Sequence, residues 1–207
     1  RLEARHIERV LSLVGVGHGS ASMPQGLDAR VEYGLLFLHA RTDDAAAMPL
    51  AAWLPVPGSL ALADGRTLQA RLAAPPQGGQ APDVARAHGL EWGGASVLLD
   101  AAVCGLDQGG IGRLWVDTFA PGDVLCPLGM HGQSKKLSDL LGEARIPAMD
   151  RPLVPIVRTA PTGSVVWVAG VRADERFRCQ PHTKLLLELT IVEPGNEAVS
   201  PRGHNGH

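Results

Sequence analysis

The stretch that most constrains this chain runs from residue 121 to 151 and reads PGDVLCPLGMHGQSKKLSDLLGEARIPAMDR. Beyond its glycines, apolar residues recur at i, i+3, i+4 and i+7, the spacing of one face of an α-helix. Ser134 is the expected N-cap, and Pro147 ends the helix near Arg145 because proline has no N–H and disfavours helical backbone before it. The sequence therefore predicts a helix at about 134–145 with an apolar stripe of Leu137, Leu140, Leu141 and Ala144.

Two lysines, Lys135 and Lys136, fall in the first turn of this predicted helix. The free N–H groups there already carry partial positive charge, so an added cation costs roughly 0.3–1 kcal/mol. A bound anion would offset that cost, and helix N-termini preceded by flexible glycines bind phosphate. The pattern favours a contact with phosphate, whereas an ordinary solvated helix face is the alternative.

The rest of the chain reads as short strands with few helices, which predicts an α+β fold built from hairpins and antiparallel strands, with the 134–145 helix packed on the C-terminal sheet. Asp64-Gly65 between alternating runs indicates a hairpin over 53–72. We expect a helix over 2–14, one strand over 31–41, a loop over 74–83, a second hairpin from 153–157 and 165–171, and a last strand over 185–192. Trp167 is expected in the core.

The expected division is a middle region over 1–100, a C-terminal domain over 101–193 and a disordered polar tail over 194–207. The chain opens on Arg1 inside a helical pattern, so we expect further protein upstream. Residues 129–178 carry a net charge of +3 and the remainder −5. This asymmetry fits a weakly basic binding face or merely a solvated one.

Three cysteines without close pairing do not form a disulfide framework, which favours a reducing, cytoplasmic location. The apolar runs are strand-length and far below the ~20 residues of a membrane helix, so no membrane partner is expected. Cys126, His131, Cys179 and His182 form an alternative zinc set if the two hairpins converge, although their spacing is unusual.

The order of these motifs resembles tRNA(Ile)-lysidine synthetases. Upstream, RHIERVLSL at 5–13, MPQGLDARVEYG at 23–34 and LPVPGSLALADGRTLQARL at 54–72 are similar to the substrate-recognition region of that family. The C-terminal motifs are Pro121-Gly122-Asp123, Pro127-Leu128-Gly129-Met130, Gly132, Lys135-Lys136-Leu137, Ile146-Pro147, Arg151, Pro155, Trp167, Gly170 and Asp174 to Arg178.

The resemblance implies the tRNA-recognising part of an ATP-dependent ligase that attaches lysine to the wobble cytidine of tRNA(Ile). The family's catalytic N-terminal domain carries an SGGxDS loop, which this sequence lacks, so the fragment alone is expected to be inactive and to hold no cofactor. ATP and magnesium belong to the full-length enzyme. The implied partners are tRNA(Ile) and that catalytic domain, with a homodimer left open.

The tRNA-binding residues that the pattern and the resemblance together suggest are Gly129, Gly132, Ser134, Lys135, Lys136, Arg145, Arg151, Arg176 and Arg178. The chain departs from the family at the PGD motif, which arginines usually flank. The residues in that neighbourhood here are Asp117, Phe119, Ala120, Val124 and Cys126. The alternatives are a weaker phosphate contact there or one supplied by Arg113. The alternative function is a non-enzymatic protein-interaction module or a stand-alone RNA-binding module.

Overall fold

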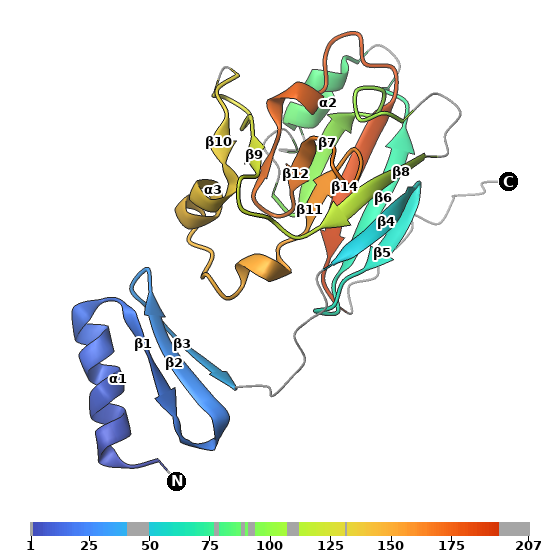
Figure 1. Cartoon of the computed structure of the whole chain (residues 1–207). Helices are drawn as coiled ribbons and strands as arrows, with labels where there is room; N and C mark the ends of the chain where they lie inside the picture. Colours follow the sequence, from blue (N-terminus) through green and yellow to red (C-terminus); the bar gives the residue numbers. More distant parts are fainter. Residues whose placement is uncertain are drawn as a thin grey trace, which may run out of the picture. The chain divides into compact units, whose positions relative to one another are not determined.

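A computed structural model describes residues 2–40, 50–76, 79–87, 90, 94–106, 112–130 and 132–194 (Figure 1). The chain separates into two compact units, Arg1–Met48 and Pro49–His207. This division differs from the expected boundary near residue 100, because strands from both sides of that position pair within the same sheets of the second unit. The expected tail lies largely outside the described residues.

The first unit is a helix on a three-stranded antiparallel sheet of order β1-β2-β3. Its elements are α1 (Ala4–Val16), β1 (Gly19–Met23), a 3-10 turn (Pro24–Gly26), β2 (Leu27–Glu32) and β3 (Leu35–Ala40). The helix predicted over 2–14 is confirmed. It is capped by Glu3, whose backbone N–H donates to Nδ1 of His6, and it ends where Gly17 adopts a φ of 83°.

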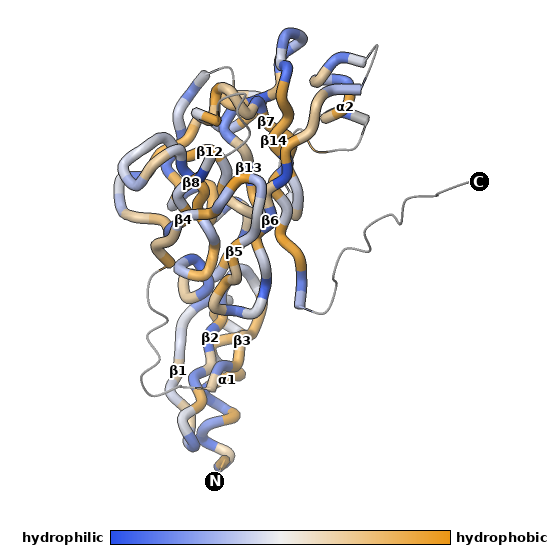
Figure 2. The backbone as a smooth tube through the Cα atoms, turned by 90° about the vertical axis from the view of Figure 1, so that its right-hand side faces the viewer, coloured by the Kyte–Doolittle hydropathy of each residue, from blue (hydrophilic) through white to orange (hydrophobic). Residues whose placement is uncertain are grey.

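The single strand predicted over 31–41 is wrong, because the chain reverses at Tyr33-Gly34. These residues have φ values of 53° and 77°, as a two-residue hairpin turn requires. Hydrophobic and hydrophilic residues alternate along α1 (Figure 2), yet no residue of the helix is fully buried. Ile7 and Leu11 on the helix and Leu38 on β3 are more than half exposed.

The second unit contains two antiparallel sheets of order β5-β6-β14-β7 and β13-β12-β11-β8-β4, and a small β9-β10 ribbon. The strands are β4 (Ala51–Val56), β5 (Gly58–Ala61), β6 (Thr67–Ala73), β7 (Ser96–Asp100), β8 (Gly112–Asp117), β9 (Val124–Leu125), β10 (Lys135–Lys136), β11 (Ile156–Arg158), β12 (Val165–Val168), β13 (Arg172–Ala173) and β14 (Leu186–Val192). The helices are α2 (Ala81–Ala87), α3 (Leu137–Glu143) and two 3-10 turns (Arg151–Leu153, Glu175–Phe177).

The α+β class is confirmed, as are both predicted hairpins: β5 pairs with β6 across Asp64-Gly65, and β11 pairs with β12. The stretch expected to be a loop over 74–83 contains the start of α2 at Ala81. The main core lies between the two large sheets and includes Leu54, Leu114, Leu187 and the fully buried Trp167. Trp167 is thus a core residue, as predicted.

The helix of the opening stretch is shorter than predicted. Lys135 and Lys136 belong to strand β10, which pairs with Leu125 and Val124 of β9. The helix begins at Leu137, so Lys136 is its N-cap in extended conformation and Ser134 is not. The apolar stripe is confirmed for its three leucines, which are buried against the face of β11 and β12 that looks away from the main core. Ala144, the fourth predicted member, is exposed and follows the end of the helix.

Candidate nucleic-acid interface

A cleft of about 440 Å³ opens on the outer face of the five-stranded sheet. Three segments line it: the loop that carries the Pro121-Gly122-Asp123 motif, the end of β11 at Arg158, and the turn at 161–165 between β11 and β12. Arg176 from the 3-10 turn at 175–177 completes the wall. The sheet therefore supplies a rigid floor, and the loops supply the rim.

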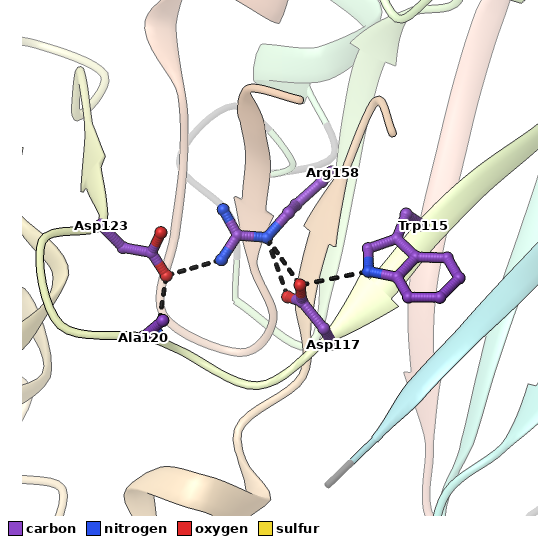
Figure 3. A network of polar contacts seen from close by, with 5 residues as sticks. All are labelled: Trp115, Asp117, Ala120, Asp123 and Arg158. Carbon is purple, nitrogen blue, oxygen red and sulfur yellow. Dashed lines mark hydrogen bonds and ion pairs between the residues drawn. The ribbon is translucent and has the colours of Figure 1, made fainter. Parts of the chain in front are cut away.

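Arg158, Asp117 and Asp123 line the part of the cleft that we call its floor. Figure 3 shows the contacts among these side chains. Its Nε donates to both carboxylate oxygens of Asp117, at 2.8 and 3.0 Å, and its Nη2 donates to Asp123 at 2.5 Å. The side chain is only 8% exposed. Burial lowers the pKa of Arg158, but hydrogen bonds from Asp123 and Asp117 outweigh burial and raise that pKa above its ordinary value. The guanidinium therefore stays charged, with its Nε and Nη2 bonded to protein carboxylates.

The same network fixes the PGD loop. Asp123 accepts the backbone N–H of Ala120 at 2.7 Å, which closes the turn, while Arg158 ties Asp123 to the sheet. On the other side, Trp115 Nε1 donates to Asp117 at 3.1 Å. Arg158 comes from another strand and pairs with both Asp117 and Asp123, so the loop is held by ion pairs within the protein.

A second network lies beside Arg176. Its Nε and Nη2 donate to the two carboxylate oxygens of Asp174, at 2.9 and 2.8 Å. Asp174 is fully buried and also accepts the backbone N–H groups of Cys126 and Arg176. The hydrogen bond to Asp174 raises the pKa of Arg176, whose side chain is still half exposed. Its outer face is accessible to a ligand.

The two lysines of β10 have different surroundings. Lys135 forms an ion pair with Glu143 of α3, and only 22% of its side chain is exposed. Lys136 is exposed and has no hydrogen bond or ion pair with the described part of the chain. It lies directly opposite Val124, which lines the cleft, so both side chains leave the same face of the β9-β10 ribbon.

The remaining predicted binding residues surround these elements without entering the cleft lining. Gly129 and Gly132 are exposed in turns with φ values of 90° and 80°, and Gly132 N–H donates to Glu175. Arg145 is exposed after α3, with a φ of 56°. Their roles in tRNA binding stay predictions, as do those of the exposed Ser134, of Arg151, which donates to the carbonyl of Ile146 at 3.2 Å, and of Arg178, which lies 3.5 Å from Glu175.

Sequence reasoning missed Arg158 and Asp117 as site residues, because they are 41 residues apart and only strand pairing brings them together. It also missed the exposed Thr162 and Ser164 in the cleft lining. The available signal was the acid at position 117 within a strand pattern, because a partly buried acid needs a cation nearby.

The alternative zinc set is only partly described, since His131 lies outside the described residues. Within the described ranges, no group of three or more His, Cys, Asp or Glu side chains could hold a metal ion. Cys179 packs in an apolar cluster with Leu98 and Leu186, and burial raises the pKa of its thiol to about 12. Its environment is that of a small apolar core residue.

Comparisons with known proteins indicate the class to which this fold and cleft belong. Residues 114–189 match the family model of the TilS substrate C-terminal domain. The chain is 34% identical over 193 residues to the tRNA(Ile)-lysidine synthase of Symbiobacterium thermophilum, which covers 89% of this chain and 36% of that protein. The corresponding enzyme of Clostridium tetani is 37% identical over 79 residues, 38% of this chain and 16% of the relative.

A solved structure described as the crystal structure of the TilS C-terminal domain is similar over 69% of this chain and 96% of that one, with 26% identity and a TM-score of 0.49. The resemblance predicted from the motifs is confirmed: residues 114–189 match the TilS substrate C-terminal domain model, and the chain is similar to tRNA(Ile)-lysidine synthases over most of its length. It spans little more than a third of the length of the Symbiobacterium relative. No helix among the described residues is long and apolar enough to cross a membrane.

Proposed function

We propose that this chain is the tRNA-binding part of a tRNA(Ile)-lysidine synthetase and that it holds tRNA mainly by its phosphate backbone. The names of the relatives and the matched C-terminal domain support the substrate class. The attachment of lysine to the wobble cytidine would take place in a catalytic domain outside this chain, because the sequence contains no SGGxDS loop.

The observation that carries the binding proposal is the pair of accessible cations at the cleft, Lys136 and Arg176. They come from different elements, β10 and the 3-10 turn at 175–177, and Lys136 has no protein partner among the described residues. Thr162 and Ser164 add exposed hydroxyl donors to the cleft wall. Two cations and two hydroxyls suit the oxygens of a phosphate diester chain.

Charge indicates where a phosphate would lie. The floor holds two carboxylates against one buried guanidinium, so Asp117, Asp123 and Arg158 together carry about one negative charge. A phosphate pushed onto this floor would be repelled. The favourable position is the rim, near Lys136 and the outer face of Arg176, with the floor acting as the support that fixes the loops.

The remaining parts of the proposal concern the whole enzyme. ATP and magnesium would bind in the catalytic domain, and we derive no step through them from the residues of this chain. The partners would be tRNA(Ile) and that domain, in the cytoplasm where tRNA is modified. A homodimer is compatible with this arrangement.

The test is tRNA binding by the purified chain at several salt concentrations, with Lys136→Ala compared against Lys135→Ala. Phosphate contacts release counterions, so we expect binding to weaken steeply with salt. Lys136→Ala should lower affinity about fivefold and reduce the salt slope by about one, as one lost phosphate contact would. Lys135→Ala is the matched control because Glu143 already pairs with Lys135. Equal effects of the two variants would contradict the proposed contact.

A second function, protein interaction, is favoured by the first unit. Ile7, Leu11, Leu36 and Leu38 leave an apolar surface exposed on α1 and β3. If the chain fails to bind tRNA at low salt but co-purifies with a protein, and Leu36→Lys with Leu38→Lys abolishes that co-purification, the chain is an interaction module.

A further inference from the structure

The outer face of the five-stranded sheet carries an aromatic pair next to the cleft. Along β4 and β8, alternate residues face the core, where Leu54, Leu114 and Val116 are fully buried. The residues between them face outward. Trp53 of β4 lies directly opposite Trp115 of β8, so two large aromatic rings stand on the side that the core does not use.

The two rings pack edge to face, with centroids 5.2 Å apart and an interplanar angle of 75°. Both tryptophans are half-buried. The hydrogen bond from Trp115 Nε1 to Asp117 fixes the orientation of one ring, and Trp115 in turn supports Trp53. This is a rigid arrangement that needs no rearrangement before a flat ligand approaches.

Arg113 lies over the Trp53 ring, with its guanidinium carbon 4.0 Å from the ring centroid. The residue is exposed and has no hydrogen bond or ion pair with the described residues. Contact with the ring favours a guanidinium that lies over it, and the N–H donors of the exposed side chain stay available. A charged plane of this kind is suited to a second flat group that bears acceptors.

The pair is continuous with the proposed phosphate-binding cleft. Trp115 faces Arg158 across β8 and β11, so Trp53, Trp115 and Arg158 form one row across three adjacent strands. Asp117 joins the two regions, since it accepts from both Trp115 and Arg158 (Figure 3). Two strand spacings, about 10 Å, separate β4 from β11, which is on the scale of a nucleotide.

We propose that Trp53, Trp115 and Arg113 form a stacking platform for an unpaired base of the RNA whose backbone lies at the cleft rim. Proteins hold unpaired bases on aromatic rings and on arginine planes, and every base has a face that can stack. This inference rests on the proposed function. It adds a contact that phosphate binding does not require, one that distinguishes unpaired nucleotides from duplex.

The test compares a short single-stranded RNA with a blunt RNA duplex of equal phosphate number, each labelled with a fluorophore for anisotropy. Arg113→Lys keeps the charge but removes the flat guanidinium, and Trp53→Leu removes the ring beneath it. Each should weaken single-strand binding about fivefold or more, leave duplex binding unchanged and leave the salt slope unchanged. Arg71→Lys, at an exposed position on β6 of the other sheet, is the matched control.

The outcomes separate this inference from the proposed function. If Lys136→Ala weakens RNA binding while Arg113→Lys and Trp53→Leu bind the single strand as the unmodified chain does, the platform is overturned and the phosphate contact stands. If no RNA binds at low salt, both fail. Binding of a proline-rich peptide in place of RNA would also overturn the platform. Arg113→Lys changes an exposed side chain, so it reports even if Trp53→Leu does not fold.

Discussion

Two arginine–carboxylate networks flank the cleft and are built in opposite ways. In one, the arginine is buried: the side chain of Arg158 is 8% exposed, between Asp117 at 21% and Asp123 at 17%. In the other, the carboxylate is buried: Asp174 is 0% exposed and Arg176 is 50% exposed. Both hold the segment from Ala120 to Cys126, but only the second leaves a guanidinium accessible to a ligand.

An arginine that stabilises the fold and an arginine that can contact a ligand count equally as positive charges, although their roles differ. A buried arginine whose charge is shared by two carboxylates stabilises the fold, and little of its side chain is exposed to RNA. An exposed arginine bonded to a buried carboxylate is held in place by that bond and still presents its charge outward. Lys135 and Lys136 show the same contrast between neighbours, because Glu143 pairs with the first and no described residue pairs with the second.

The largest expected effect is on folding, from Arg158→Ala. Removing the guanidinium leaves two carboxylates close together without their partner, and breaking a buried ion pair in this way costs about 3–5 kcal/mol. We expect a loss near the lower end, about 3 kcal/mol, because both acids are partly exposed. Urea unfolding followed by tryptophan fluorescence measures it, since all four tryptophans belong to the second unit.

Arg86→Ala is the control for that measurement. Arg86 pairs with Asp83 at the surface, with both side chains about two-thirds or more exposed, so the expected change in unfolding free energy is within about 0.5 kcal/mol. Similar losses for Arg86→Ala and Arg158→Ala would show that burial of the Arg158 network contributes nothing special.

Arg176→Ala should differ from Arg158→Ala because it also lowers the affinity for tRNA. Asp174 would keep its two backbone N–H donors but lose its charged partner while fully buried, so we expect a loss of about 1.5–3 kcal/mol in unfolding free energy. Affinity for tRNA should fall about fivefold, and the salt slope should fall by about one. Arg176→Lys should recover part of the affinity. A large loss of stability with unchanged tRNA affinity would make Arg176 another structural arginine.

Between pH 7 and 10, the contribution of the two arginine networks to stability should differ from that of the buried thiols. Both arginines have raised pKa values in the fold, so their contribution to stability is present below the ordinary arginine pKa and is constant from pH 7 to 10. Burial raises the thiol pKa of Cys179 from 9.0 to about 12 and also raises that of Cys104. The unfolded chain therefore loses these protons first, and stability falls as pH rises above 9.

The measurement is unfolding free energy at pH 8, 9 and 10. We expect Cys179→Ala to remove about 1 kcal/mol of the decline between pH 9 and 10, and Arg176→Ala to leave the decline unchanged. If the decline disappeared in Arg176→Ala, the pH dependence would come from Arg176, and its assignment to the buried thiols would be wrong.

Sequence patterns predicted the elements whose signals are local. The leucine stripe of α3 and the Asp64-Gly65 hairpin follow from periodicity and turn chemistry over a few residues. The reversal at Tyr33-Gly34 was missed because tyrosine is rare at positive φ and gives no turn signal.

Other features depend on partners distant in sequence. Lys135 and Lys136 form a strand because β9 pairs with them and the backbone carbonyl of Asp123 accepts the N–H of Leu137. A strand of two residues is too short to show a periodic pattern in the sequence. The Arg158 network joins residues 35 and 41 positions apart. The alternation along each strand in the sequence indicates that Trp53 and Trp115 face outward, since the neighbouring leucines and valines face the core.

The most direct test of the central claim is chemical footprinting of lysines by acetylation, with and without tRNA(Ile). The chain has three lysines, Lys135, Lys136 and Lys184, so mass spectrometry can follow each one. If tRNA phosphates lie at the cleft rim, tRNA should protect Lys136 strongly, while the exposed Lys184 keeps its rate. Equal acetylation of Lys136 with and without saturating tRNA would contradict the account.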